Sequence, residues 1–299
     1  MQDQTVTMIH NLAPSILCRE HGEAIMDSPV DRGKGAAPTV VFVAGQPGSG
    51  AAGVAGALQK TMRRGTAVID LDEQLATAPD GEALVTSLVE KSPRRRRIDF
   101  VLHTTLMLGG DVTEPAEAFR AAGYRIEVAI VAVPEALSRM ALLKDHFAAQ
   151  GMDAGLDRRH DLGVRNVRAL AQRIEQTPLV DVAAVYDRYG KQLAVDPSDP
   201  AAARTGDCIE RALLAEHERR WSAAETQRFV SDFDYYRKFP QLTDALVDLA
   251  RSVDRQLMDP TVAWLSYANM AQMPRRSPAE PVSKAHPRGV KAAMAAGGS

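Results

Sequence analysis

Residue types and spacings that indicate chemistry are concentrated in one segment of this 299-residue chain, Gly45-Gln46-Pro47-Gly48-Ser49-Gly50-Ala51-Ala52. Gly45 and Gly50 have the spacing of the phosphate-loop pattern G-x-x-x-x-G-K-[ST]. In that pattern backbone N–H groups hold phosphates, the lysine binds the β- and γ-phosphates, and the hydroxyl binds Mg²⁺. Ala51 and Ala52 stand at the lysine and hydroxyl positions. We therefore predict an anion site made by the backbone at a helix N-terminus, without the cation and the metal ligand. A glycine-rich turn with no ligand is the alternative.

The segments around this loop have the patterns of elements that position a phosphate site. A continuous β-branched apolar run over residues 39–44 predicts a strand buried on both faces, and a helical pattern follows the loop. Further strands are predicted at 66–70, 99–103, 126–133 and 181–186, and helices at 79–90, 114–122, 134–150 and 160–176. This alternation predicts an α/β fold, a parallel sheet flanked by helices.

The remainder of the chain has no strand pattern after about residue 196. Three amphipathic helices are predicted at 201–218, 222–238 and 240–258, the second of which begins with the capping box Ser222 to Glu225. The predicted organisation is an N-terminal arm or linker at 1–37, the α/β domain at 38–196, a C-terminal helical region at 197–270 and a disordered tail at 271–299.

Composition excludes several classes of protein. With 36 basic and 38 acidic residues the net charge is −2, which argues against a generally basic nucleic-acid-binding protein. Cys18 and Cys208 are too few for a disulfide framework or a cysteine zinc site, and no metal site is predicted. The chain has no apolar run of membrane-spanning length and no signal-peptide pattern, so we expect a cytoplasmic protein that does not contact a membrane.

Several segments together resemble the zeta toxin family, bacterial P-loop kinases of toxin–antitoxin systems. The segments are VVFVAGQPGSG, VIDLDE, AFRAAGYRIEVAIVAVP, HDLGVRNVRAL and LVDVAAVYDRYGKQL, spread from about Thr39 to Leu193. The resemblance implies a P-loop kinase fold, ATP and Mg²⁺ as cofactors, UDP-N-acetylglucosamine as the phosphate acceptor and an antitoxin as partner.

The resemblance also assigns candidate substrate residues. It places Asp72 at the family's general base, which accepts the proton of the sugar hydroxyl. An alternative is that Asp70 and Asp72 cap the turn after their strand. His103 replaces a family glutamate at the end of the third strand, and Thr105 follows at a hydroxyl position. His103 and Thr105 are therefore candidates for contact with substrate or phosphate.

Two further departures affect the residues that hold ATP phosphates in the family. Asp145 and Asp153 stand where the resemblance places phosphate-binding arginines. A carboxylate there would repel a triphosphate. The neighbouring cations Lys144, Arg158 and Arg159 are the candidates for a replacement clamp.

The sequence therefore favours a protein with the family's fold and with little or no phosphoryl transfer. We interpret it as a pseudokinase or binding protein for an antitoxin-like helical protein or for a second copy of itself. Two alternatives stay open: an active sugar-nucleotide kinase with a remodelled phosphate clamp, and a zeta toxin inactivated by engineered alanines at positions 51 and 52.

Overall fold

A computed structural model describes most of the chain between residues 37 and 260. The described ranges are 37–76, 80–90, 98–106, 112–149, 156–176, 178–197, 208–239, 242–253 and 257–260. Almost all of the predicted N-terminal arm, the whole tail at 271–299 and Asp153 lie outside these ranges.

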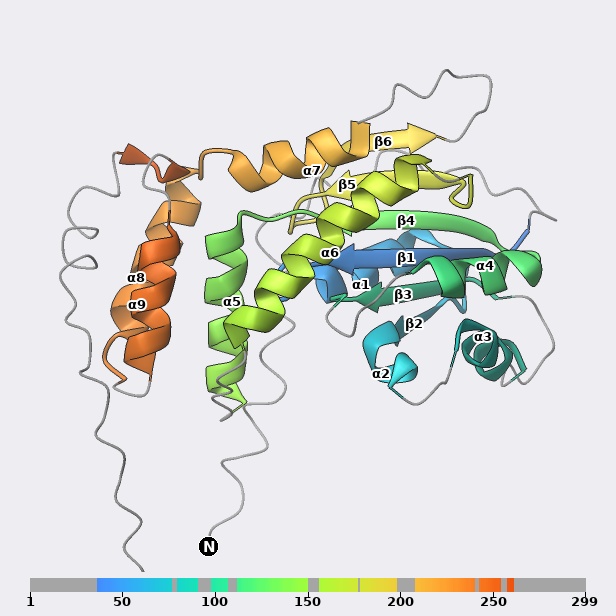
Figure 1. Cartoon of the computed structure of the whole chain (residues 1–299), viewed down its shortest axis with the longest axis horizontal. Coiled ribbons are helices and arrows are strands. Elements are labelled where there is room, and N and C mark those ends of the chain that lie inside the picture. Colours follow the sequence, from blue (N-terminus) through green and yellow to red (C-terminus); the bar gives the residue numbers. More distant parts are fainter. Residues whose placement is uncertain are drawn as a thin grey trace, which may run out of the picture.

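The described strands form one six-stranded sheet in the order β2-β3-β1-β4-β5-β6 (Figure 1). Their bounds are Thr39–Gly45 (β1), Ala67–Asp70 (β2), Phe100–Thr104 (β3), Arg125–Val131 (β4), Val182–Tyr186 (β5) and Gln192–Pro197 (β6). The pairs among the first five strands are parallel, and β6 is antiparallel to β5. The α/β fold is confirmed, and the first five strands lie within two residues of their predicted bounds.

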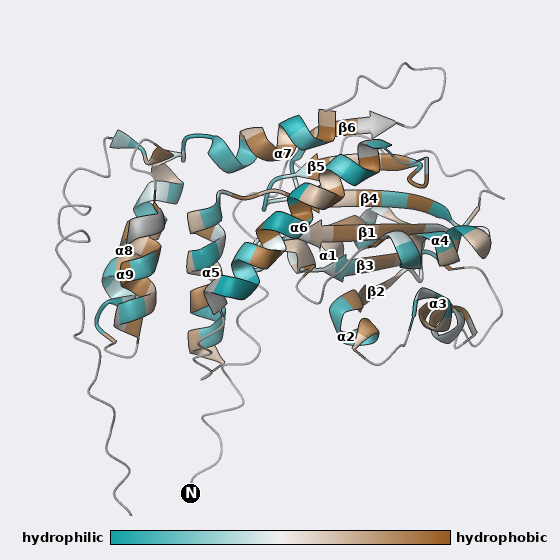
Figure 2. Ribbon diagram, viewed as in Figure 1, coloured by the Kyte–Doolittle hydropathy of each residue, from teal (hydrophilic) through white to brown (hydrophobic). Residues whose placement is uncertain are grey.

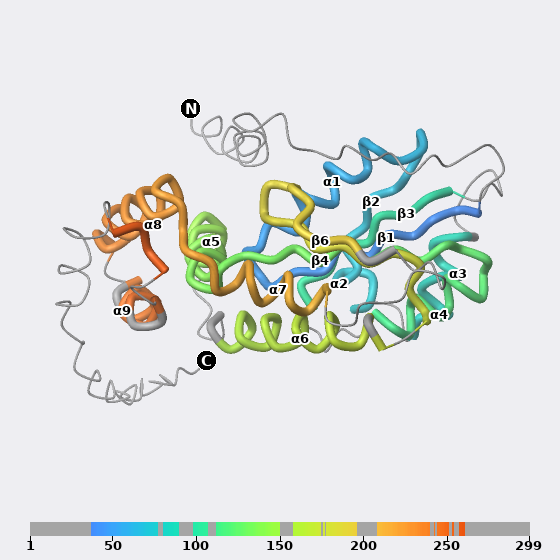
Figure 3. Tube along the Cα trace, turned by 90° about the horizontal axis from the view of Figure 1, so that it is seen from above, coloured from blue at the N-terminus to red at the C-terminus, as the bar shows by residue number. Residues whose placement is uncertain are grey.

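Helices cover both faces of the sheet, as Figure 3 shows from above. The helices before the C-terminal region are α1 (Ala51–Thr61), α2 (Leu71–Leu75), α3 (Gly81–Glu90), α4 (Thr113–Ala121), α5 (Glu135–Ala148) and α6 (Leu156–Gln176). Because side chains alternate along a strand, Val41 and Val43 of β1 pack in a core with α1 and α5, whereas Val40 and Phe42 pack in a core with α3, α4 and α6. The central strand is therefore buried on both faces, as its unbroken apolar run predicts.

The sixth strand was not expected from the sequence. The turn before it is fixed by Asp187, whose Oδ1 accepts from the N–H groups of Tyr189 (2.8 Å) and Lys191 (2.9 Å). Leu193 and Val195 of β6 are exposed on this edge of the sheet. A short, mostly exposed edge strand lacks the strong apolar pattern on which the other strands were recognised.

The C-terminal helices α7 (Cys208–Glu218), α8 (Ala223–Tyr236) and α9 (Thr243–Ser252) confirm the three predicted helices. The predicted capping box is present: Ser222 Oγ accepts from the N–H of Glu225 (3.2 Å), and Glu225 Oε2 accepts from the N–H of Ser222 (2.8 Å). α7 packs on β5, β6 and α6, whereas α8 and α9 pack on α5, with Phe229 and Phe233 buried in the same core as α1 (Figure 1).

Figure 2 shows hydrophilic and hydrophobic residues interspersed along the outer helices, whereas β1 at the centre of the sheet is largely hydrophobic. In the part of the chain that the structure describes, no helix combines the length and the apolar character needed to cross a membrane.

Candidate functional site

The predicted phosphate loop connects β1 to α1 and has a backbone shape that favours glycine. Gly48 and Gly50 have φ angles of +76° and +90°, in the left-handed region. Helix α5 approaches this loop closely. A Cβ atom at Gly48 would overlap with the carbonyl oxygen of Ser138 and lie 2.9 Å from the backbone nitrogen of Leu142. The loop therefore requires glycine at position 48 both for its conformation and for its contact with α5.

The first turn of α1 carries unused backbone donors. The N–H groups of Gly53 and Val54 donate to the carbonyl oxygen of Gly50, at 2.9 and 3.1 Å. Those of Ala51 and Ala52 have no acceptor among the residues described. Such donors at the positive end of a helix dipole attract an anion. These donors lie where the sequence predicts a backbone anion site, and binding of an anion there stays a prediction.

A buried polar chain holds the loop against α5 and α6. Gln46 Nε2 donates to the carbonyl oxygen of Val133 (2.7 Å), and Ser138 Oγ lies 3.4 Å from the same nitrogen. Because the Ser138 hydroxyl donates to the carbonyl of Glu135 (2.9 Å), it accepts from His160 Nε2 (2.7 Å). His160 is fully buried, and burial lowers its pKa to about 4 by disfavouring the imidazolium. A neutral histidine therefore connects α6 to the helix that contacts the loop.

Asp72 and Thr105 are brought together, at the carboxyl edge of the sheet. Asp72 Oδ1 accepts from Thr104 Oγ1 (2.6 Å), and its Oδ2 accepts from the N–H (2.8 Å) and Oγ1 (2.6 Å) of Thr105. These contacts occupy three of about four acceptor positions of a carboxylate. The arrangement makes Asp72 a clamp on the end of β3, and its role as the general base stays a prediction. Asp70 caps α2 by accepting from the N–H of Glu73 (3.2 Å).

Replacing Asp72 with Asn tests this structural role. The amide NH₂ would face at least one of the three donors, and we expect the variant to lose about 1–3 kcal/mol of unfolding free energy. Asp70→Asn is the matched control, because Asn caps a helix about as well as Asp. This substitution should change the unfolding free energy by less than about 0.5 kcal/mol. Thermal denaturation of the two variants measures the difference, and equal melting temperatures would rule the clamp out.

His103 lies half-buried in β3, in register with Asp70 of β2 and Val43 of β1. This level of the sheet is close to the carboxyl ends of the strands, where parallel α/β sheets bind their ligands. His103 is therefore on the expected edge, and its contact with substrate or phosphate stays a prediction.

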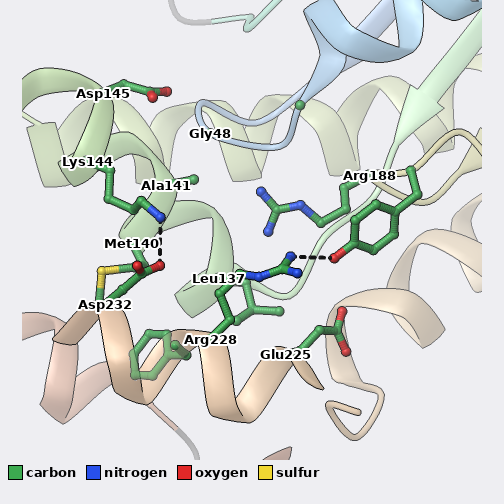
Figure 4. A pocket seen from close by; sticks show the side chains of 13 residues that line it. Gly48, Leu137, Met140, Ala141, Lys144, Asp145, Arg188, Glu225, Arg228 and Asp232 are labelled. Atoms are coloured by element: carbon green, nitrogen blue, oxygen red, sulfur yellow. Dashed lines mark hydrogen bonds and ion pairs between the residues drawn. The ribbon is translucent and has the colours of Figure 1, made fainter. Parts of the chain in front are cut away.

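A cavity of about 190 Å³ lies beside the loop, between α5, α8 and the turn after β5 (Figure 4). Gly48 and Gly50 form its loop side. The other lining residues are Leu137, Met140, Ala141, Lys144 and Asp145 of α5, Arg188 and Tyr189 of the turn, and Glu225, Arg228, Phe229 and Asp232 of α8.

The three cations proposed from the sequence occupy different places. Lys144 lines the cavity, but its Nζ is paired with Asp232 Oδ2 of α8 at 2.7 Å. Arg158 is exposed and Arg159 half-exposed on the first turns of α6, and neither lines the cavity. Asp145 lies at the exposed rim of the cavity, so an acid does stand near the loop.

Sequence reasoning missed two cations of the cavity, Arg188 and Arg228. Arg188 lies in LVDVAAVYDRYGKQL, one of the segments that resemble the zeta toxin family. Arg228 comes from α8, and no local pattern indicates that this helix reaches the loop. Asp232, which neutralises Lys144, was missed for the same reason.

The donor set at the loop does not fit a divalent cation. The position that supplies a hydroxyl to Mg²⁺ in this loop pattern is Ala52. Among the described residues, no group of three or more His, Cys, Asp or Glu side chains could hold a metal ion. The backbone donors of α1 fit an anion, and the metal ligand is missing.

Comparison with known protein families shows the family to which this chain belongs. The sequence model described as Zeta toxin matches residues 26–86 and 74–196, together more than half of the chain. The chain belongs to the zeta toxin family. This is a family of P-loop kinases that use ATP and Mg²⁺. The loop after β1 has alanine at positions 51 and 52, and its assignment as the family's phosphate loop stays a prediction. The match begins inside the segment predicted as an N-terminal arm.

A solved structure supports the fold of this zeta toxin family member. It comes from the PezAT chromosomal toxin-antitoxin system of the human pathogen Streptococcus pneumoniae, and matches with a TM-score of 0.51 and 17% identity, over 80% of this chain and 98% of that one. At this identity the match shows a shared fold. None of the curated proteins with which the chain was compared matches it.

Proposed function

We propose that this zeta toxin family member is a pseudokinase, a kinase scaffold that binds a nucleotide at the phosphate loop without transferring its phosphoryl group. The observation that carries the proposal is the loop itself. Its backbone donors at Ala51 and Ala52 are retained, while both side chains that supply cation and metal ligand are reduced to methyl groups. In phosphoryl transfer the protein contributes mainly positioning and charge stabilisation, so removing both groups removes most of what it contributes.

The cavity supports the same proposal. Lys144 could replace the lost lysine only by breaking its 2.7 Å ion pair with Asp232. Asp72, at the general-base position, already accepts three hydrogen bonds. An active kinase with a remodelled clamp is the competing proposal, and it would need a rearrangement that brings Arg158 or Arg159 to the loop.

Activity is tested by incubating the full chain with MgATP and UDP-N-acetylglucosamine and measuring ADP release and sugar phosphorylation. We expect no turnover above the background of a protein-free control, because losing one preorganised donor costs about 10²–10³ in rate and here two groups are absent. Detectable, protein-dependent phosphorylation of the sugar nucleotide would overturn the pseudokinase proposal in favour of the remodelled kinase.

The double variant Ala51→Lys, Ala52→Thr refines this test. We expect it to remain inactive, because Asp145 still lines the cavity and Asp72 remains engaged by Thr104 and Thr105. Full family-like activity in this variant would instead indicate a sound site disabled at two positions only, as in a toxin inactivated by engineering.

For the partner, the PezAT match suggests a protein of the antitoxin kind, and we propose a helical antitoxin-like partner or a second copy of the chain as the bound protein. Size-exclusion chromatography with light scattering of the purified chain, alone and co-expressed with the product of an adjacent open reading frame, separates these cases.

A further inference from the structure

We propose that Arg188 and Arg228 form a two-arginine clamp that binds the polyphosphate chain of a nucleotide at the loop without a metal ion. This rests on the proposed nucleotide-binding role and deepens it, by naming the cations that take the place of the absent lysine and Mg²⁺.

Arg188 is carried to the loop by the turn between β5 and β6. Asp187 fixes this turn through hydrogen bonds to two backbone N–H groups, and Gly190 follows with a φ of +85°. The carbonyl oxygen and Cβ of Arg188 lie 3.5 and 3.8 Å from the point that a Cβ atom on Gly50 would occupy. The backbone of Arg188 thus lies against the last glycine before α1, on a rigid support.

Arg228 reaches the same space from α8. Its Nη1 lies 3.3 Å from the hydroxyl of Tyr189, a neutral partner that orients the guanidinium. No carboxylate among the described residues forms an ion pair with this exposed side chain. Figure 4 shows the side chains of Arg188 and Arg228 extending into the cavity, Arg188 from the turn after β5 and Arg228 from α8. Two guanidinium groups are therefore directed at one space next to the unused donors of α1.

The carboxylates of the lining do not neutralise this pair. Asp232 is bound to Lys144 at 2.7 Å, and Glu225 to Arg219, which lies outside the lining, at 2.5 and 2.8 Å. Asp145 is the remaining carboxylate, and its charge acts on Arg188 from the rim. Arg188 is half-buried and Arg228 is exposed at the mouth of the cavity. Two guanidinium charges thus face one carboxylate, and this local excess of positive charge favours an anion.

The chemistry of the walls indicates the class of anion. Leu137, Met140, Ala141 and Phe229 give the cavity an apolar side. Its volume of about 190 Å³ is below the roughly 300 Å³ typical of pockets for whole ligands, so the cavity has room for only part of a nucleotide. An apolar wall beside two guanidinium groups fits a nucleotide, whose base takes the wall and whose phosphates take the arginines. Guanidinium groups are always charged and bind phosphate through two parallel hydrogen bonds, so they compensate phosphate charge without Mg²⁺.

Isothermal titration of the full chain with ATP, in Mg²⁺ and separately in EDTA, tests the clamp. We expect the two Kd values to agree within about threefold. Arg188→Ala and Arg228→Ala should each weaken binding about 10- to 100-fold, and Arg188→Lys should fall between wild type and Arg188→Ala. Arg220→Ala, which removes an exposed arginine just before α8, is the matched control and should bind like wild type. Unchanged melting temperatures establish that the variants are folded.

Inorganic triphosphate distinguishes the two parts of the ligand. Triphosphate should compete with ATP but bind more weakly, because it has no base to pack on the apolar wall. Equal affinity of triphosphate and ATP would overturn the assignment to a nucleotide. The clamp is overturned if ATP binds only with Mg²⁺, if both alanine variants bind as wild type, or if ATP does not bind at all. Turnover with UDP-N-acetylglucosamine is scored separately. Turnover overturns the pseudokinase proposal alone, whereas arginine-independent binding without turnover overturns the clamp alone.

Discussion

The protein is expected to lose about 3 kcal/mol of unfolding free energy for each of two buried histidines when the pH falls from 7 to 4. His160 on α6 and His217 on α7 are 0% and 4% exposed. Burial, with a further contribution from a nearby arginine, lowers the pKa of each to about 4. The unfolded chain therefore binds more protons than the folded one between pH 6.5 and 4. The stability that the two neutral histidines contribute is fully present above pH 6.5. It is lost progressively as the pH falls from 6.5 to 4.

His217→Leu isolates one of these contributions. Neither ring nitrogen of His217 has a hydrogen-bond partner in the described part of the chain, so an apolar side chain of similar size should not lower stability at pH 7. We expect it to remove about 1.4 kcal/mol per pH unit from the slope between pH 6.5 and 4. Urea denaturation of both proteins at pH 7, 6, 5 and 4 measures the slopes.

The control for this series is Leu213→Ala, which empties a buried position on α7 without removing a titrating group. It should lower stability by a similar amount at every pH and leave the slope intact. A wild-type stability that is flat from pH 6.5 to 4, or an identical slope in His217→Leu, would contradict the assignment.

The second large effect is expected from Gly48→Ala, which should lower the unfolding free energy by about 3 kcal/mol. Two costs combine. The residue has a φ of +76°, and its new Cβ would overlap with the carbonyl oxygen of Ser138 in α5. Because the obstacle is helix backbone, it cannot rotate away as a side chain can. The loop and α5 must therefore separate, and nucleotide binding should weaken together with stability.

Gly56→Ala is the control within the same loop–helix unit. No atom lies within 4 Å of its added Cβ, and the residue is inside α1, where alanine is favoured over glycine by about 0.5–1 kcal/mol. Thermal denaturation should therefore show opposite shifts for the two substitutions. Equal melting temperatures would mean that α5 does not constrain the loop.

Most of the fold could be predicted because local patterns were strong. The run from Thr39 to Gly45 is buried throughout, and a strand buried on both faces needs such a run. The strand β6 could not be recognised in this way, because Leu193 and Val195 are exposed and only its pairing with β5 makes it a strand. The capping box of α8 was found because it is a local arrangement of Ser222 and Glu225.

The candidate site likewise has features that local sequence patterns predicted and features that they could not predict. Glycine spacing alone predicted the phosphate loop, and Arg188 lies in one of the segments that resemble the family. Lys144 was selected as a replacement cation because it neighbours Asp145 in the sequence. Its ion pair with Asp232, 88 positions away, could not be inferred from any local pattern.

By itself the sequence determined what the phosphate loop lacks, because Ala51 and Ala52 have no cation and no hydroxyl in any conformation. It also determined the parallel sheet that places the loop at a helix N-terminus. Only the tertiary structure decided which charges surround the loop. The packing of α8 on α5 sets the distances between residues far apart in the chain, so it pairs Lys144 with Asp232 and brings Arg228 to face Arg188.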